Sequence, residues 1–327
     1  MKTYTARTPL DLIALAPYVL GFHPEDSVVL MTFGGGEPFH ARVDLPLDVA
    51  GQESVSTMLE GAARKHAAPF AAVLVYSDDV EAAATMAELL VAGLCHAGVE
   101  VVDALRVEGE EYFDCLDTTL PGIPYDLSTH PFTASRVFDG RVAHDSRAAL
   151  ADTLVGTDED DRAAVHQAAT RFADAVLAEH GVDSIRDAGD RWLGEQALWL
   201  HDRLLELPGE GRQVRGLSVS DCGRLLVLLS QLSLRDVAWG IIDRENARVQ
   251  VDLWRELVRR APDELLAAPA ALLGFAAWQA GDGALAWCAL DRCTAVDADY
   301  GLAEIVADLL TRAVPPSAWT AMRQRAS

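Results

Sequence analysis

The sequence has few cysteines and no arrangement that would link them. Its 327 residues include five cysteines and no CxxC pair. An odd, scattered set of this kind is typical of reduced thiols inside a cell and not of a disulfide framework. Structural zinc sites need ligands at short, regular spacings, so we expect no metal and no cofactor. The cysteines are Cys95, Cys115, Cys222, Cys288 and Cys293.

Basic residues are also scarce. The chain has 27 lysines and arginines against 50 aspartates and glutamates, so its formal net charge is −23. Such a field repels phosphate backbones and anionic membranes. No uninterrupted apolar run approaches the roughly 20 residues of a membrane span, and no apolar stretch of signal-peptide length follows Lys2 and Arg7. We expect a soluble, cytoplasmic protein that binds neither nucleic acid nor membrane.

The chain has enough apolar side chains for two folded domains. Hydrophobic residues make up 50% of the sequence and charged residues 24%, which excludes intrinsic disorder. The length is about twice that of a typical single domain. A proline-containing passage over residues 117–146 separates two different patterns. We therefore place the domains at residues 1–145 and 146–327.

The first pattern begins with a helix and a hairpin. Thr8, Pro9 and Asp11 have the spacing of a capping box with proline in the first turn. An apolar run over residues 28–33 reads as a buried strand, three glycines turn the chain back, and residues 39–45 alternate as an antiparallel partner. One face of that partner has Phe39, Ala41, Val43 and Leu45, and the wetter face has His40, Arg42 and Asp44.

A strand–helix–strand unit follows the hairpin. Helical spacing predicts a helix over residues 51–67, and residues 70–76 read as a second buried strand. A capping box that begins at Asp78 opens another helix, which ends near Gly98. Strands over residues 99–107 and through Tyr112 and Phe113 complete a mixed sheet. The first domain is therefore predicted to be α+β or α/β, with a hairpin and a βαβ unit.

The second pattern is helical throughout, from about residue 147. Asp158 to Asp161 is interpreted as the solvated start of a helix, where negative charge complements the helix dipole. Further on, small and large residues alternate at the spacings of a tetratricopeptide-type helix pair. The second domain is therefore predicted to be all-α and partly tetratricopeptide-like. The residues with these spacings are Leu273, Gly274, Ala277, Gly281, Asp282, Ala286, Leu290 and Cys293.

Polar residues before the first strand form one candidate site. A histidine base, carboxylates and a guanidinium would meet there if the hairpin brings its two strands together. The alternative is structural, because Asx and Ser turns commonly precede strands and bond the local backbone. One histidine beside carboxylates has no diagnostic metal spacing. The candidate residues are His23, Glu25, Asp26, Ser27, Arg42 and Asp44.

Tryptophans of the second domain form a candidate partner surface. Trp254, Trp278 and Trp287, together with Trp239, could line a groove for a protein partner, because aromatic residues are enriched at interface hot spots. Their helical spacing favours the alternative that most of them belong to the core.

Three segments together resemble a known family. They are residues 4–9, residues 21–30 and residues 41–46, with support from residues 140–150 and 281–287. The sequence resembles the actinobacterial family described as domain of unknown function 4192. The resemblance implies an actinobacterial, intracellular setting and brings no established activity. Many members have a cysteine-rich segment after the last strand of the first domain, where this chain has Cys115 alone.

Two functional hypotheses follow from these patterns. The leading one is a non-enzymatic interaction or regulatory module that binds a protein partner through its helical domain, because no catalytic motif is present. The alternative is an enzyme of hydrolase or transferase type, with His23 as general base, Arg42 as anion clamp and the carboxylates of Glu25 and Asp26 nearby.

Overall fold

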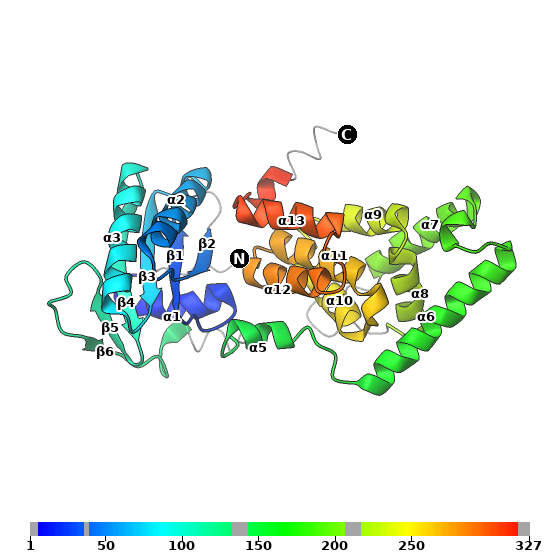
Figure 1. Ribbon diagram of the computed structural model, residues 1–327, viewed down its shortest axis with the longest axis horizontal. Coiled ribbons are helices and arrows are strands. Elements are labelled where there is room, and N and C mark those ends of the chain that lie inside the picture. The colour runs from blue at the N-terminus through cyan, green and yellow to red at the C-terminus, as the bar shows by residue number, and fades with distance from the viewer. Residues whose placement is uncertain (1–5, 36–38, 133–142, 207–216, 320–327) are drawn as a thin grey trace. The chain divides into compact units, whose positions relative to one another are not determined.

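The computed structural model of the protein describes residues 6–35, 39–132, 143–206 and 217–319. Its contacts divide the chain into two compact units. The first unit contains Met1–Leu150 and the short segment Arg312–Pro315, and the second contains Ala151–Thr311 and Pro316–Ser327. Figure 1 shows the first unit as a sheet with helices and the second as helices alone.

The first unit is built on a six-stranded mixed sheet of order β2-β1-β3-β4-β5-β6. The hairpin β1–β2 pairs antiparallel, β1 also pairs antiparallel with β3, and β3 pairs parallel with β4. This arrangement confirms the predicted hairpin joined to a βαβ unit. The strands are β1 (Ser27–Phe33), β2 (His40–Asp44), β3 (Phe70–Tyr76), β4 (Glu100–Glu108), β5 (Glu111–Asp114) and β6 (Ile123–Pro124).

Two helices cover one face of this sheet. They are α2 (Val49–Lys65) and α3 (Val80–His96), and their apolar side chains share one buried cluster with alternate residues of β1, β3 and β4. The apolar side chains at positions 39, 41, 43 and 45 of the returning strand belong to the same cluster or pack against it. The predicted alternation of that strand is therefore confirmed on its apolar side.

The central strands are also buried on the other face of the sheet. Val29, Met31 and Leu74 point away from the α2–α3 cluster and are fully buried. Helix α1 (Pro9–Leu20), which contacts β2, supplies its own set of buried apolar side chains. The polar side of the edge strand β2 was expected to be the wetter one, and Asp44 is 85% exposed there. His40 is half-buried, and its Nδ1 atom is buried without a hydrogen-bond partner among the described residues.

Local capping was predictable from the sequence to within one residue. Thr8 Oγ1 accepts a hydrogen bond from Asp11 N at 3.2 Å, and Asp11 Oδ2 accepts one from Thr8 N at 3.0 Å, which confirms the capping box of α1. Gly21 ends this helix at φ 80°. Helix α3 begins one residue later than predicted, because Asp79 caps it and not Asp78.

The second unit consists of helices of ordinary globular length. The elements from the boundary onward are α5 (Arg147–Asp152), α6 (Glu159–His180), η1 (Ile185–Asp187), α7 (Asp190–Glu206), α8 (Val219–Leu229), α9 (Leu232–Ile241), α10 (Ala247–Arg260), η2 (Asp263–Leu265), α11 (Ala267–Gln279), α12 (Gly283–Thr294) and α13 (Gly301–Thr311). None of the helices in the described ranges is both long and apolar enough to span a membrane.

Glycines allow two helix pairs of this unit to approach closely. A Cβ atom added to Gly223 of α8 would lie 2.6 Å from Ala169 N of α6, so only glycine fits at that crossing. A Cβ atom added to Gly274 of α11 would lie 2.8 Å from Leu290 Cδ2 of α12. The second contact joins the two helices that the sequence pattern singled out as a tetratricopeptide-type pair.

Arg260 joins three segments of the helical unit. Its Nε and Nη2 atoms donate to the two carboxylate oxygens of Asp161 on α6, at 2.7 and 2.8 Å, and its Nη1 donates to Leu217 O at 2.9 Å. The side chains of Arg260 and Asp161 are only 12% and 29% exposed. The interpretation of residues 158–161 as a solvated helix start is confirmed for Asp158, which caps α6, and for the exposed residues 159 and 160, whereas Asp161 is partly buried by its contact with Arg260.

We expect opposite effects from two alanine substitutions of helical glycines. Gly223→Ala should lower the free energy of unfolding by about 1–3 kcal/mol, because the new methyl group overpacks the α6–α8 crossing. Gly194→Ala on exposed α7, where an added Cβ meets nothing within 4 Å, should raise it by roughly 0.5–1 kcal/mol through helix propensity alone. Urea unfolding measures both values. Equal stabilisation by the two substitutions would contradict the close crossing.

The bidentate contact of Arg260 gives a second prediction. Arg260→Lys keeps the charge but loses the two parallel hydrogen bonds to Asp161, so the free energy of unfolding should fall by about 1–3 kcal/mol. The control is Arg191→Lys, because Arg191 forms an exposed i,i+4 pair with Glu195 at 3.1 Å; it should change stability by less than about 0.5 kcal/mol. Similar urea midpoints for both variants and the wild type would show that the contact does not hold these helices together.

Candidate functional site

The candidate residues before β1 lie beside the carboxyl end of β3. Ser27 is paired with Tyr76 of β3 on one side and with Asp44 of β2 on the other. Open α/β sheets bind ligands at this edge, so the position suits a site. The backbone of the loop is held firmly, because Asp26 O accepts a hydrogen bond from Leu45 N and His23 N donates one to His144 O.

The charged side chains of this loop bond to each other and to backbone. Arg42 Nη2 donates to Glu25 O at 2.8 Å, and Arg42 Nη1 forms a close ion pair with Asp44. The guanidinium is therefore neutralised and oriented by groups of the protein itself. His23, Glu25, Asp26 and Asp44 are exposed at the surface. The structure thus brings Arg42, Asp44 and the backbone of Glu25 together, and this arrangement is the one expected of a structural turn.

Ser27 and Tyr76 have polar atoms that no ligand can reach in this conformation. Ser27 is fully buried, and neither Ser27 Oγ nor Tyr76 OH has a hydrogen-bond partner within the described parts of the chain. Burial raises the pKa of Tyr76, which keeps its hydroxyl neutral. Asp26 adopts a left-handed backbone conformation, with φ 41°, which Asp tolerates in turns. Neither of the two surface hollows described below is lined by these residues.

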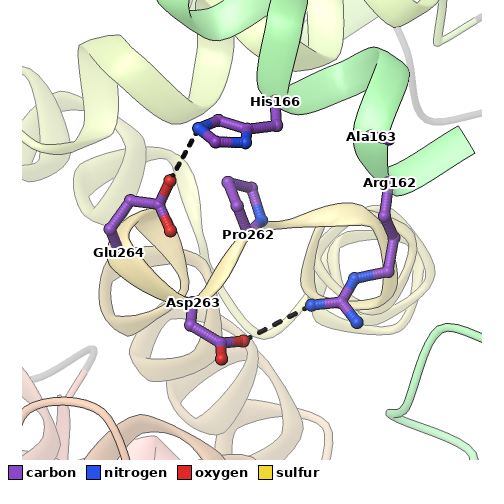
Figure 2. Close-up of a pocket in the computed structure, with 6 residues that line it drawn as sticks. All are labelled: Arg162, Ala163, His166, Pro262, Asp263 and Glu264. Carbon is purple, nitrogen blue, oxygen red and sulfur yellow. Dashed lines mark hydrogen bonds and ion pairs between the residues drawn. The ribbon is translucent and has the colours of Figure 1, made fainter. Parts of the chain in front are cut away.

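The larger hollow lies in the helical unit and has a volume of about 240 Å³. Figure 2 shows side chains of α6 on one side and of η2 on the other. Arg162 pairs with Asp263 at 3.4 Å, and His166 Nε2 lies 2.9 Å from Glu264 Oε1. Both carboxylates along the rim thus have a nitrogen partner beside them. We call this region the ion-pair hollow, lined by Arg162, Ala163, His166, Pro262, Asp263 and Glu264.

The second hollow is aromatic, with a volume of about 170 Å³. Trp239 and Trp319 stack with ring centroids 5.5 Å apart and an interplanar angle of 29°. Phe275 packs edge-on beneath both indoles, at 5.7 Å from Trp239 and 5.4 Å from Trp319. We call this region the indole hollow, lined by Asp236, Trp239, Gly240 and Trp319.

Two polar groups at the indole hollow make fewer hydrogen bonds with the described residues than they could. Trp239 Nε1 is buried and has no hydrogen-bond partner among the described residues. Arg235 donates to Asp236 Oδ1 through Nε at 3.1 Å and through Nη2 at 2.6 Å, while the Asp236 side chain stays 54% exposed. Arg235 is itself 12% exposed and lies 3.5 Å from Tyr300 OH. Both hydrogen bonds thus go to one oxygen of the carboxylate, and the second oxygen accepts none from the described residues.

The tryptophans selected from the sequence lie mostly in the core. Trp254 is fully buried and Trp278 is 4% exposed, so neither can contact a partner in this conformation. Trp287 reaches the surface, with 36% of its area exposed. Sequence reasoning missed Asp236 and Trp319. A signal existed for α9, because positions 236, 239 and 240 have the i, i+3, i+4 spacing of one helix face. Trp319, in a polar terminal segment, has no such pattern around it.

The comparisons with known proteins identify a family for this chain. The family model for a domain of unknown function, number 4192, matches residues 9–317. The chain therefore belongs to that family, which confirms the resemblance found in the sequence. No curated protein and no solved structure matches the chain. Within the described residues, no three His, Cys, Asp or Glu side chains are grouped to hold a metal ion.

The buried histidine of the first unit predicts a pH effect on stability. Burial lowers the pKa of His40 from 6.5 to about 4. Between these values the unfolded chain binds a proton that the folded chain does not, so the free energy of unfolding falls as the pH falls. Relative to His40→Gln, the wild type should lose on the order of 3 kcal/mol between pH 7 and pH 4. Urea unfolding at several pH values measures the difference, and parallel profiles for the two proteins would contradict a buried neutral imidazole.

Proposed function

We propose that this protein is a non-enzymatic interaction or regulatory module that binds a protein partner through its helical unit, at the indole hollow. One observation carries the proposal: two indoles and an oriented carboxylate line an open hollow of the helical unit. Tryptophan is the residue most enriched at interface hot spots, where an aromatic anchor fills or lines a small desolvated pocket. On the family resemblance, we place this activity in the cytoplasm of an actinobacterial cell.

The size of the hollow favours a partner side chain over a small-molecule substrate. Pockets for drug-sized ligands and cofactors usually measure about 300–1,000 Å³, and the indole hollow measures about 170 Å³. A volume of this size suits one protruding side chain. The close α11–α12 contact at Gly274 supports a tetratricopeptide-like pair beneath the site, since Phe275 and Trp278 of α11 lie against Trp319.

The polar loop of the first unit supports the alternative hypothesis less well. A general base and an anion clamp need side chains that are free to act on a substrate. Arg42 instead donates to Glu25 O and pairs with Asp44. The loop therefore has a sufficient structural role at the start of β1. We propose that the sheet unit provides a second binding surface of the same interaction module.

Site-specific photo-cross-linking tests the proposal on the full chain. Gly240 lines the indole hollow, and an added Cβ there meets nothing within 4 Å, so p-benzoylphenylalanine can replace it without a clash of the first side-chain atom. Matched controls are Gly61 on α2 and Gly194 on α7, which are helical glycines with the same open surroundings. After irradiation in cells of the source organism, we expect one discrete cross-linked protein from the Gly240 position only.

The controls decide what the experiment means. Cross-linking of the same protein from all three positions would indicate non-specific collision and would contradict the assigned surface. A discrete product from Gly61 alone would move the binding surface to the sheet unit. No product from any position, with the variant proteins folded and abundant, would contradict the protein-partner proposal.

A further inference from the structure

The indole hollow contains two features that a ligand could use together. Its aromatic side chains are Trp239 and Trp319, and its carboxylate is that of Asp236. The Asp236 side chain is 54% exposed, so a ligand in the hollow can reach it.

We propose that the indole hollow binds an arginine side chain of the partner protein. The inference rests on the proposed function and adds the chemistry of the partner. A guanidinium is planar, stacks on aromatic faces and donates hydrogen bonds in the plane of the group. In the indole hollow it stacks on an indole face and donates to Asp236.

The orientation of Asp236 explains how a second guanidinium can be accommodated. Both hydrogen bonds from Arg235 go to Oδ1, and Oδ2 accepts none from the described residues. Arg235 is 12% exposed and is also held by Tyr300 OH, so it orients the carboxylate without filling the hollow. A cation over the face of a tryptophan is attracted by the ring quadrupole, and more strongly when it is desolvated.

Charge complementarity favours a cationic anchor over an apolar one. The formal net charge of −23 draws basic segments toward the protein and repels acidic ones. The ion-pair hollow offers an internal comparison, because it is larger but is lined by no tryptophan, tyrosine or phenylalanine. The carboxylates of both hollows already have a nitrogen partner: Asp263 has Arg162, Glu264 has His166, and Asp236 has Arg235. The two hollows therefore differ in the aromatic face on which a guanidinium can stack.

Two short peptides of the same shape test the inference on the full chain. The probes are acetyl-Gly-Arg-Gly-amide and its citrulline counterpart, in which a neutral urea replaces the guanidinium. Binding is followed through the indole N–H signals in ¹⁵N-labelled protein, assigned with Trp239→Phe and Trp319→Phe. We expect the arginine peptide to shift the signals of Trp239 and Trp319 saturably, with at least tenfold higher affinity than the citrulline peptide. Equal affinity of the two peptides would overturn the inference.

Two substitutions locate the interaction. Asp236→Asn should weaken binding of the arginine peptide at least fivefold, and Asp236→Glu should restore part of the loss. Asp263→Asn is the matched control, since it removes an exposed, arginine-paired aspartate from the ion-pair hollow; it should leave the affinity unchanged. Equal losses from Asp236→Asn and Asp263→Asn would mean that the peptide senses only net charge and would also overturn the inference. If Asp236→Asn does not fold, the arginine–citrulline comparison on the wild type decides the question.

The outcome separates this inference from the proposed function. A cross-link from the Gly240 position that persists in the Asp236→Asn variant, together with equal affinities of the two peptides, would refute the arginine anchor and leave the partner surface standing. If p-benzoylphenylalanine at position 240 gives no cross-linked product even with Asp236 unchanged, the proposed surface itself is refuted.

Discussion

The ion pair between Arg260 and Asp161 is the constraint on which the helical unit depends. It joins the last turn of α10 to the first turn of α6, and the same guanidinium holds the backbone at Leu217, just before α8. Three helices that are far apart in sequence are thereby fixed at one point. A partly buried guanidinium destabilises the fold unless its N–H groups are hydrogen-bonded. Three hydrogen bonds are made here, two to the carboxylate of Asp161 and one to Leu217 O. The arrangement leaves little freedom for these helices to slide.

The indole hollow is positioned by this constraint through two short connections. Only Ser230 and Gln231 separate α8 from α9, so fixing α8 also fixes the helix that carries Asp236 and Trp239. On the other side, α10 packs against α11, whose Phe275 supports both stacked indoles. The close glycine contacts at the α6–α8 and α11–α12 crossings add rigidity. A preorganised hollow loses less conformational entropy on binding than a mobile one.

The sequence predicted local features well and long-range ones poorly. The capping box at Thr8 and Asp11 and the apolar face of β2 were readable because they depend on spacings of a few residues. The burial of the His40 Nδ1 atom could not be predicted, since it depends on the three-dimensional surroundings of the strand and not on the spacing along it. Trp319 joins an aromatic cluster with Trp239, which lies 80 positions earlier in the chain. No periodic pattern connects such residues.

The two polar regions differ in what their charged groups already bond. In the loop before β1, the guanidinium of Arg42 donates to a backbone carbonyl and pairs with a carboxylate, so both contacts would have to break before Arg42 could bind a substrate. At the indole hollow, both hydrogen bonds from Arg235 go to one oxygen of Asp236, and the other oxygen accepts none from the described residues. That oxygen can accept a hydrogen bond from a partner without the loss of an existing one. Because an exchange of hydrogen bonds contributes little net free energy, the proposed site for a partner is at the indole hollow and not at the loop.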